Sequence, residues 1–557
     1  MADPRATPAV SPGHAARMFP TLTAEQIERI STHGRRRYVR QGDVLIEAGS
    51  FPVPFFVIVS GEVEIVRPTG SAETMVAVHG AGAFTGEGNL LLGRRSLMRA
   101  RVGQSGEVIE LTREDLLGLI QNDTQISEIV MRAFIYRRLE LIAQGLGDVV
   151  IVGSKHSSAT LRVREFLARN GHPFAFVDLD HDADAQEMLD RFHVTPDDVP
   201  VLICRGDVVL RNPDNQAIAD CLGFNEAIDR THVRDVVIVG AGPSGLAAAV
   251  YGASEGLDVL MVESVSPGGQ AGTSSRIENY LGFPMGIAGQ ELAGLALSQA
   301  QKFGSEFMVG QRAASLACDR TPYEIGLGDE RRVPSKTVII ATGAEYRRLP
   351  IEGLSRFEGA GIYYAATHME RQLCAKEEVV VVGGGNSAGQ AAVFLAETAA
   401  KVHLLVRSSG IVDTMSRYLI RRIEECPSIE LHTHTEIVEL SGNGELDGIT
   451  WRARDGSTSA SPIRHVFMMT GAIPNTAWLQ GCVALDDKGF VKTGPDLTAG
   501  DLAAARWPLT RQPHLLETSL PGVFAVGDVR SNNIKRVASA VGEGSIAISF
   551  VHRVLTG

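Results

Sequence analysis

The stretch RDVVIVGAGPSG, residues 234–245, places a short apolar run directly before a Gly-rich turn of the form GxGxxG. Small residues follow, and a second apolar run, residues 258–262, ends at Glu263, 23 positions after Gly240. This order predicts a strand, a tight turn, a helix and a parallel strand, the arrangement that binds a dinucleotide. We expect the pyrophosphate at the helix N-terminus and the ribose hydroxyls at Glu263. The expected contacts in the turn are Gly240, Gly242, Pro243, Ser244 and Gly245.

A second stretch, EVVVVGGGNSA at residues 378–388, repeats the pattern as GxGxxA. Its next strand, residues 401–406, ends at Arg407 instead of an acid. An arginine at this position favours the 2′-phosphate of NADPH, with NADH as the open alternative. The expected contacts to NAD(P) are Gly383, Gly385, Asn386, Ser387, Ala388 and Arg407.

Two further strand ends favour FAD over NAD at the first site. One predicted strand ends in Ala341-Thr342-Gly343, and another ends in Gly527-Asp528. An acid at the end of such a strand can bind the ribityl or phosphate region of a flavin nucleotide.

These motifs resemble the glutathione-reductase superfamily, and residues 231–557 are similar to its low-molecular-weight thioredoxin reductase branch. GGQ at 268–270, IENYLGFP at 277–284 and KRVA at 535–538 match the segments near the flavin in that branch. The resemblance implies a homodimer that uses FAD and NADPH. It also implies further FAD contacts at Gly269, Gln270, Asn279, Ala341, Thr342, Gly343, Gly527, Asp528, Arg536, Val537 and Ala538.

The redox-active Cys-Ala-Thr-Cys segment of that branch is replaced here by AATH, residues 365–368. His368 falls where the flavin-contacting sulfur would be, and it either exchanges protons near the flavin or only fills space. Cys374, six residues later, has no nearby partner thiol in the sequence. We therefore predict an NAD(P)H oxidoreductase whose acceptor is a quinone, oxygen or a small redox protein. Two alternatives stay open: disulfide reduction by a non-standard route, and a non-catalytic redox or nucleotide sensor.

Residues 18–147 alternate short apolar runs with glycines, which predicts a small β-roll. They resemble cyclic-nucleotide-binding domains, whose phosphate cassette would begin at residues 84–87. The resemblance implies amides near Gly86 for phosphate and the Glu87 carboxylate for a ribose hydroxyl. The cassette arginine aligns with Ser96; Arg95 lies one position earlier and Arg99 three positions later, and Arg95 is the candidate contact to the cyclic phosphate. Cyclic-nucleotide binding and a degenerate structural sensor both stay open.

Residues 148–225 predict a βαβ–ββα unit that resembles glutaredoxin and thioredoxin folds. SKHSS at 154–158 occupies the loop where CxxC would lie. Pro200 matches the family's Pro-containing strand entry and predicts a cis bond after Val199. We expect a docking or scaffold module.

Composition and charge restrict the classes of protein that this sequence can belong to. The 53 basic and 65 acidic residues give a net charge of −12, which argues against binding nucleic acid through a general field. No apolar run is long enough to span a membrane. Six widely spaced cysteines predict reduced thiols and a cytoplasmic setting.

The expected class is a multidomain α/β protein with an N-terminal β-roll, a thioredoxin-like domain and two Rossmann-like domains. The expected boundaries are a disordered tail at 1–17, the β-roll at 18–147, the thioredoxin-like domain at 148–225, the FAD domain at 232–347 and 472–557, and the NAD(P) domain at 348–471.

Overall fold

The computed structural model describes most of the chain. The described residues are 18–69, 72–143, 149–155, 157–179, 198–204, 208–274, 276–328, 331–347, 349–358, 360–366, 368–443, 445–479 and 481–556. One compact unit comprises residues up to 153, 164–229 and 299–310, and the other comprises 154–163, 230–298 and 311–557. Each unit is described by itself, and the domain boundaries drawn from the sequence stay predictions. The expected tail at 1–17 lies outside the described residues, and so do residues 180–197 of the expected thioredoxin-like domain.

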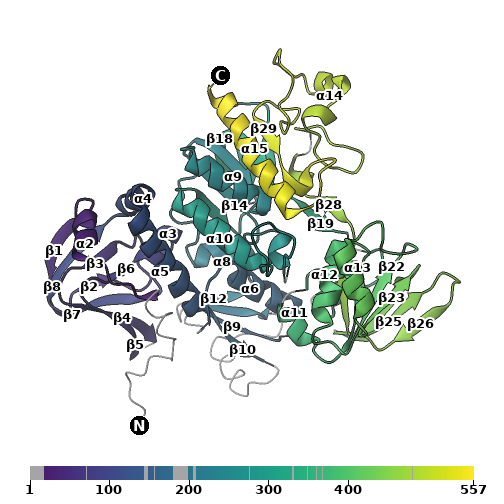
Figure 1. Ribbon diagram of the computed structural model, residues 1–557, viewed down its shortest axis with the longest axis horizontal. Coiled ribbons are helices and arrows are strands. Elements are labelled where there is room, and N and C mark those ends of the chain that lie inside the picture. The colour runs from purple at the N-terminus through teal and green to yellow at the C-terminus, as the bar shows by residue number, and fades with distance from the viewer. Residues whose placement is uncertain are drawn as a thin grey trace, which may run out of the picture. The chain divides into compact units, whose positions relative to one another are not determined.

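The β-roll of the first unit consists of two four-stranded antiparallel sheets (Figure 1). One sheet has the order β1-β8-β3-β6 and the other β2-β7-β4-β5. The strands are β1 (Arg35–Val39), β2 (Val44–Ile46), β3 (Phe55–Ile58), β4 (Glu62–Thr69), β5 (Ala72–His79), β6 (Phe84–Thr85), β7 (Arg99–Gln104) and β8 (Gly106–Leu111). The helices are α2 (Ala24–Ser31), α3 (Glu87–Leu92), α4 (Arg113–Asn122) and α5 (Thr124–Ala143).

Strand β3 is buried on both faces, which explains its unbroken apolar sequence. Phe55 and Val57 pack in one cluster with residues of α2, α4 and α5. Phe56 and Ile58 point the other way, into a cluster shared with β4 and β7. The period of two along a strand therefore places one set of side chains against the helices and the other between the sheets.

The thioredoxin-like sheet has the order β10-β9-β11-β12. β10 pairs with β9 in parallel, and the next two pairs are antiparallel, as the predicted βαβ–ββα unit requires. Its elements are β9 (Val149–Gly153), α6 (Ser158–Arg169), β10 (Ala175–Asp178), β11 (Val201–Cys204), β12 (Val208–Arg211) and α8 (Asn215–Cys221). The bond between Val199 and Pro200 is cis, as predicted.

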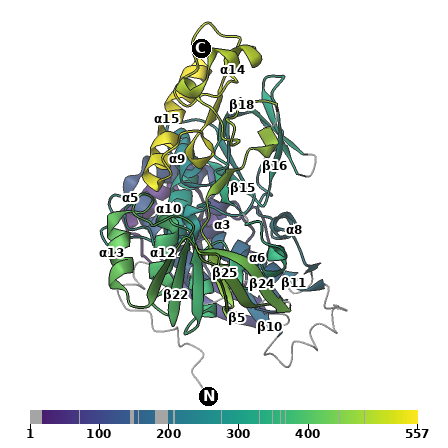
Figure 2. The same ribbon diagram turned by 90° about the vertical axis from the view of Figure 1, so that its right-hand side faces the viewer.

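The first Rossmann-like sheet of the second unit has a parallel centre in which β14, β13, β18 and β29 are neighbours. β17 and β16 extend it in antiparallel fashion. Helix α15 packs along α9, and Figures 1 and 2 both show the two side by side. The bounds are β13 (Arg234–Val239), α9 (Pro243–Ser254), β14 (Val259–Glu263), α10 (Gly289–Lys302), β15 (Glu306–Val309), β16 (Ala313–Ala317), β17 (Tyr323–Leu327), β18 (Arg332–Ile340), β29 (Val523–Ala525) and α15 (Val537–Thr556).

The second Rossmann-like sheet has the order β20-β27-β21-β22-β23 and is parallel throughout. Helices α12 and α13 cover one face through a shared core cluster, and the three-stranded sheet β24-β25-β26 covers the other (Figure 2). The bounds are β20 (Ile362–Tyr363), α11 (His368–Leu373), β21 (Glu378–Val382), α12 (Asn386–Leu395), β22 (Lys401–Val406), α13 (Arg417–Glu425), β23 (Ile429–Thr433), β24 (Glu436–Asn443), β25 (Glu445–Arg452), β26 (Thr458–Ser461) and β27 (His465–Met468). The strands β19 (Ala344–Tyr346) and β28 (Ala472–Pro474) form a two-stranded antiparallel sheet. They lie in the two segments of the chain that connect the two Rossmann-like sheets.

Helices long and apolar enough to cross a bilayer are absent from the described part of the chain.

A buried carboxylate anchors the loop before β29. The side chain of Glu517 is 0% exposed and accepts two hydrogen bonds from the Arg511 guanidinium, at 2.6 and 2.9 Å. The backbone N–H groups of His514 and Gly522 donate to the same carboxylate at 2.8 and 2.9 Å. Burial alone would raise the pKa of Glu517, but these hydrogen bonds and the charge of Arg511 outweigh it and lower the pKa below its usual range.

Replacing Glu517 with glutamine should therefore cost stability, by about 3–5 kcal/mol, since it leaves Arg511 without its buried counter-charge. A carboxyl with a depressed folded pKa stabilises the fold above its unfolded pKa of about 4.3 and loses that contribution as the pH falls. The difference in unfolding free energy between wild type and Glu517→Gln should thus be largest near pH 7 and shrink below about pH 4.3. Denaturant unfolding at several pH values measures it, with the exposed Glu25→Gln as control. A difference that does not change with pH would contradict this account.

Candidate functional site

The first Gly-rich turn joins β13 to α9 at the carboxyl end of the parallel sheet. Gly240 has a positive φ of +107°, so the turn needs glycine there. Gly242 is the N-cap of α9 and makes no side-chain capping bond, and space is open within 4 Å of where its Cβ would be. Among the described residues, no side chain therefore caps the first N–H groups of α9. This fits a pyrophosphate, the group that the motif predicts.

Glu263 lies at the end of β14 and secures this turn. Its carboxylate accepts hydrogen bonds from the backbone N–H groups of Ala241 and Val265, both at 2.8 Å. Each carboxylate oxygen has a second lone pair, so the ribose hydroxyls predicted for Glu263 still have acceptors. The contact to Ala241 also fixes the turn beside the place where that ribose would lie.

Other predicted FAD residues converge on the same turn. A Cβ on Gly240 would lie 2.3 Å from the Ala341 carbonyl oxygen, and one on Gly527 would lie 2.5 Å from the Ser244 hydroxyl. Gly269 approaches Gly242 closely from another loop. The structure therefore brings together strand ends and loops that are far apart in the sequence. The residues it brings together are Gly240, Gly242, Ser244, Gly245, Gly269, Ala341 and Gly527.

The remaining predicted FAD residues are placed less tightly. Gln270 donates its side-chain amide to the Ala344 carbonyl, and the Thr342 hydroxyl donates to the Asn475 carbonyl at 2.8 Å. Burial raises the pKa of Asp528, which follows β29. Three of the other predicted residues are exposed: Asn279 in its loop, Arg536 just before α15 and Ala538 in its first turn.

The second Gly-rich turn joins β21 to α12. Gly383 has a φ of +145°, and Gly385 is the N-cap of α12 without a side-chain capping bond. Asn386 does not face the helix end, because its side-chain oxygen accepts a hydrogen bond from the Ser416 N–H at 2.7 Å. Arg407, directly after β22, is exposed, and within the described residues its guanidinium has neither a hydrogen bond nor an ion pair. It is therefore available for a phosphate.

The segment that replaces the cysteine pair runs from β20 into α11, which begins at His368. Thr367 lies outside the described residues, and the side chain of His368 is not described, so the predicted role of His368 stays a prediction. Cys374 is 0% exposed within a hydrophobic core cluster. Burial raises the pKa of its thiol to about 12. A protonated, enclosed thiol is a poor nucleophile, which argues against a catalytic role for Cys374.

The expectation of six reduced cysteines is wrong. Cys318, which follows β16, and Cys482 are joined by a disulfide with their Cα atoms 5.8 Å apart. The pair is 164 positions apart in the sequence, so spacing alone gave no sign of it. The fold brings the two segments together within the range that a disulfide bridges. Cys374 and Cys426 are free thiols.

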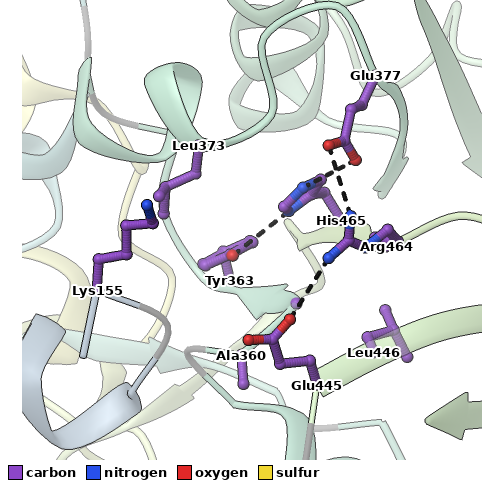
Figure 3. Close-up of a pocket in the computed structure, with 10 residues that line it drawn as sticks. Lys155, Ala360, Tyr363, Leu373, Glu377, Glu445, Leu446, Arg464 and His465 are labelled. Atoms are coloured by element: carbon purple, nitrogen blue, oxygen red, sulfur yellow. Dashed lines mark hydrogen bonds and ion pairs between the residues drawn. The ribbon is translucent and has the colours of Figure 1, made fainter. Parts of the chain in front are cut away.

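A small hollow of about 80 Å³ lies beside β20 and β27 (Figure 3). Its wall holds a charged network in which Arg464 lies 3.9 Å from Glu377 and 3.4 Å from Glu445. The His465 Nε2 atom lies 3.2 Å from the Glu377 carboxylate. No sequence motif marked this hollow, because its residues come from separate strands and loops. It is also lined by Lys155, Tyr363, Leu373 and Leu446.

In the β-roll, Gly86 has a φ of +95°, and the Glu87 side chain is 5% exposed. One Glu87 oxygen accepts a hydrogen bond from Arg137 at 2.8 Å, and the other is buried and has no hydrogen-bond partner among the described residues. That oxygen fits the ribose hydroxyl implied for Glu87. Arg95 is engaged elsewhere, in a two-bond ion pair with Glu226 at 2.7 Å. Its pairing competes with the phosphate role predicted for Arg95.

Comparisons with known proteins agree with this geometry. Residues 234–544 match the family described as pyridine nucleotide-disulphide oxidoreductase, and residues 36–123 match the cyclic nucleotide-binding domain. A thioredoxin reductase of Listeria monocytogenes is 31% identical over 317 residues, which cover 57% of this chain and 92% of that protein. NADPH-dependent thioredoxin reductase 3 of Arabidopsis thaliana is 33% identical over 332 residues, which cover 58% of this chain and 59% of that protein.

Two solved structures match with a TM-score of 0.52 each. The thioredoxin reductase of T. acidophilum is 30% identical, and the match covers 59% of this chain and 100% of that one. The thioredoxin reductase of Lactococcus lactis is 26% identical, with 58% and 99% covered. These findings confirm both resemblances drawn from the motifs, that of the two nucleotide turns and that of the β-roll.

Proposed function

Because the chain belongs to the pyridine nucleotide-disulphide oxidoreductase family and is built like its thioredoxin reductases, we propose that it oxidises NADPH through bound FAD. The electrons then leave for an acceptor outside the two Rossmann-like domains. FAD, when bound, would supply the site that takes a hydride from the nicotinamide and releases electrons singly or in pairs. The sequence contains no CxxC pair to relay them, so the acceptor differs from an internal dithiol of that type.

This proposal rests mainly on two helix N-termini of one compact unit that no described side chain caps. α9 and α12 each begin at a glycine without a side-chain cap, each after a strand of a parallel sheet. An uncapped helix start is a binding place for a phosphate group. Two such places, with an acid after one neighbouring strand and an arginine after the other, support one flavin nucleotide and one NADPH.

In this scheme, residues of the chain itself bind the two nucleotides and orient them. Glu263 holds the first turn and offers acceptors to a ribose. Asp528, with its raised pKa, lies three residues after the end of β29, at the carboxyl end of the same sheet. We propose that His368 holds or moves the proton that accompanies reoxidation, in the place where the related enzymes have a cysteine. Cys374 takes no part, because it is enclosed and protonated.

The acceptor can be identified by assaying candidate acceptors one at a time. Purified protein with NADPH is offered a naphthoquinone, dissolved oxygen or an oxidised thioredoxin, and NADPH consumption is followed for each. We expect the quinone, oxygen or another small redox carrier to sustain turnover and the oxidised thioredoxin to do so poorly. Fast reduction of thioredoxin would instead favour a disulfide reductase with a non-standard route. Nucleotide-driven conformational change without any turnover would favour a sensor.

Substituting Arg407 with alanine should raise the KM for NADPH by at least about tenfold and leave the KM for NADH nearly unchanged. A hydrogen bond to a charged group contributes about 1.5–3 kcal/mol, and only NADPH has the 2′-phosphate that would receive it. Steady-state kinetics with both nucleotides measures the split. Arg454→Ala removes another exposed arginine of the same domain and should change neither constant. Equal rises for both nucleotides in Arg407→Ala would remove this role.

We further propose that the β-roll regulates the enzyme by binding a cyclic nucleotide. The support is the buried, unpartnered oxygen of Glu87 beside the positive-φ turn at Gly86. A ribose hydroxyl would satisfy that oxygen, whose desolvation is otherwise unfavourable. Isothermal titration with cyclic AMP and cyclic GMP tests the idea, with Glu87→Gln as the variant. Equal binding by Glu87→Gln, or none by the wild type, would favour a degenerate structural domain.

A further inference from the structure

Two histidines and a glutamate meet at the edge of the second Rossmann-like sheet, where β22 and β23 face the three-stranded sheet (Figure 1). His403 lies on β22 opposite Glu430 of β23 in the parallel register, and His432 is two residues further along β23. The period of two places all three side chains on one face. The function proposed above makes no use of this cluster, which we call the histidine cluster.

The ligand atoms of the histidine cluster lie close together. His403 Nδ1 is 3.0 Å from His432 Nε2, and His432 Nε2 is 3.6 Å from Glu430 Oε1. All three groups offer an atom within 4.8 Å of one another. Zinc binds imidazole nitrogen at about 2.0–2.1 Å and carboxylate oxygen at about 2.0–2.2 Å, which puts tetrahedral ligand atoms about 3.3–3.5 Å apart. His403 Nδ1 lies 4.0 Å from the Glu430 carboxylate, so the Glu430 side chain would have to move closer to His403 for all three groups to reach this spacing.

The side chains of His403 and Glu430 each have a second contact, on the atom that faces away from His432. His403 Nε2 lies 3.1 Å from the Glu378 carboxylate of β21, so Nε2 carries the proton and the Nδ1 lone pair faces His432. Lys401 holds Oε2 of Glu430, which leaves Oε1 directed at His432. Metal-binding histidines usually donate their other N–H to such a carboxylate, which orients the ring and increases its basicity.

The surroundings also favour ligation. The indole of Trp451, on β25, lies 5.3 Å from the His403 ring and 5.5 Å from the His432 ring, measured between centroids. The His403 side chain is 8% exposed and that of His432 is 22% exposed, so a fourth position would open toward solvent. The facing charged groups are Glu378, Glu430 and Lys401.

We propose that His403 Nδ1, His432 Nε2 and Glu430 Oε1 bind one zinc ion, with the fourth position left to water or another small ligand. Two imidazoles and one carboxylate form a ligand set known for zinc, and harder ions such as magnesium prefer oxygen alone. The ion would join β22 and β23 at the edge of the sheet. It would thereby stabilise the strand that ends at Arg407.

The test uses the full-length flavoprotein after chelation and dialysis, titrated with zinc, and with cobalt as a visible-absorbing probe. We expect one ion per chain, a higher melting temperature with zinc, and cobalt absorption of a four-coordinate site. His432→Gln should weaken zinc binding at least about tenfold, and Glu378→Gln should weaken it about 10–100-fold through the orientation of His403. His552→Gln, which removes a histidine of the FAD domain paired with Glu255, is the control and should bind like the wild type.

Flavin content and metal-free melting temperature establish that each variant is folded. No zinc binding by the wild type would overturn the proposal. Equal binding by the wild type and by folded His432→Gln would also overturn it, because the ion would then lie elsewhere. Magnesium binding as tightly as zinc would show a carboxylate site of another kind. Since NADPH oxidation is not the readout, failure here would leave the proposed function standing.

Discussion

Protein carrying Gly245→Val should purify without flavin. A Cβ at this position would lie 1.9 Å from the Gly240 carbonyl oxygen and 3.3 Å from the Ala341 side chain. The first is a backbone atom of the phosphate turn itself, so the larger side chain can be accommodated only if α9 moves away from β13. The uncapped start of α9 would move with it.

We expect the ratio of FAD to protein to fall at least about tenfold, which corresponds to about 1.4 kcal/mol of binding free energy. Absorbance of the purified protein and of the released flavin measures this ratio. Gly294→Ala is the matched control, since its Cβ would meet open space on α10 in the same half of the unit. Normal flavin content in folded Gly245→Val would place the flavin elsewhere in the molecule.

Gly383→Ala should have the complementary effect, with flavin retained and reduction by NADPH lost. Gly383 has a φ of +145°, and its Cβ would lie 2.4 Å from the Met469 carbonyl oxygen. The substitution therefore moves the turn that leads into α12 and leaves the first turn, at Gly240, unchanged. Opposite outcomes in the two glycine variants would assign one nucleotide to each turn.

The expected result is a fall of at least about a hundredfold in the rate of NADPH-dependent flavin reduction, or about 2.7 kcal/mol. Chemical reduction by dithionite should remain complete, because it does not use the second turn. Gly410→Ala, at a loop glycine whose Cβ would meet no described atom within 4 Å, should behave like the wild type. Loss of flavin in Gly383→Ala, or an unchanged NADPH rate, would contradict the assignment.

Local sequence patterns predicted the strand–turn–helix units well, because the residues that determine each turn are consecutive in the sequence. The run before Gly240 became β13, and the small residues after it became α9. The second turn gave β21 and α12 in the same way. The thioredoxin-like unit could also be predicted from its sequence, including the cis bond before Pro200. In each case the deciding residues are neighbours in the sequence.

Features that depend on distant segments could not be predicted this way. The Cys318–Cys482 disulfide joins loops that only the completed FAD domain brings together. Arg95 was expected near a phosphate, but Glu226, 131 positions away, pairs with its guanidinium. The histidine cluster depends on the register of β22 and β23, which no local spacing reveals. The sequence thus predicts local strand–turn–helix units better than it predicts which distant side chains pair with one another.

The most direct test of the central claim is anaerobic stopped-flow absorbance of the flavoprotein mixed with NADPH. The account predicts rapid bleaching of the flavin bands, slower bleaching with NADH, and recovery of the bands when a quinone or oxygen is then added. Flavin that stays oxidised with both nucleotides, in protein shown to contain FAD, would contradict an oxidoreductase. The two nucleotide turns would then belong to a sensor that binds these molecules without reacting them.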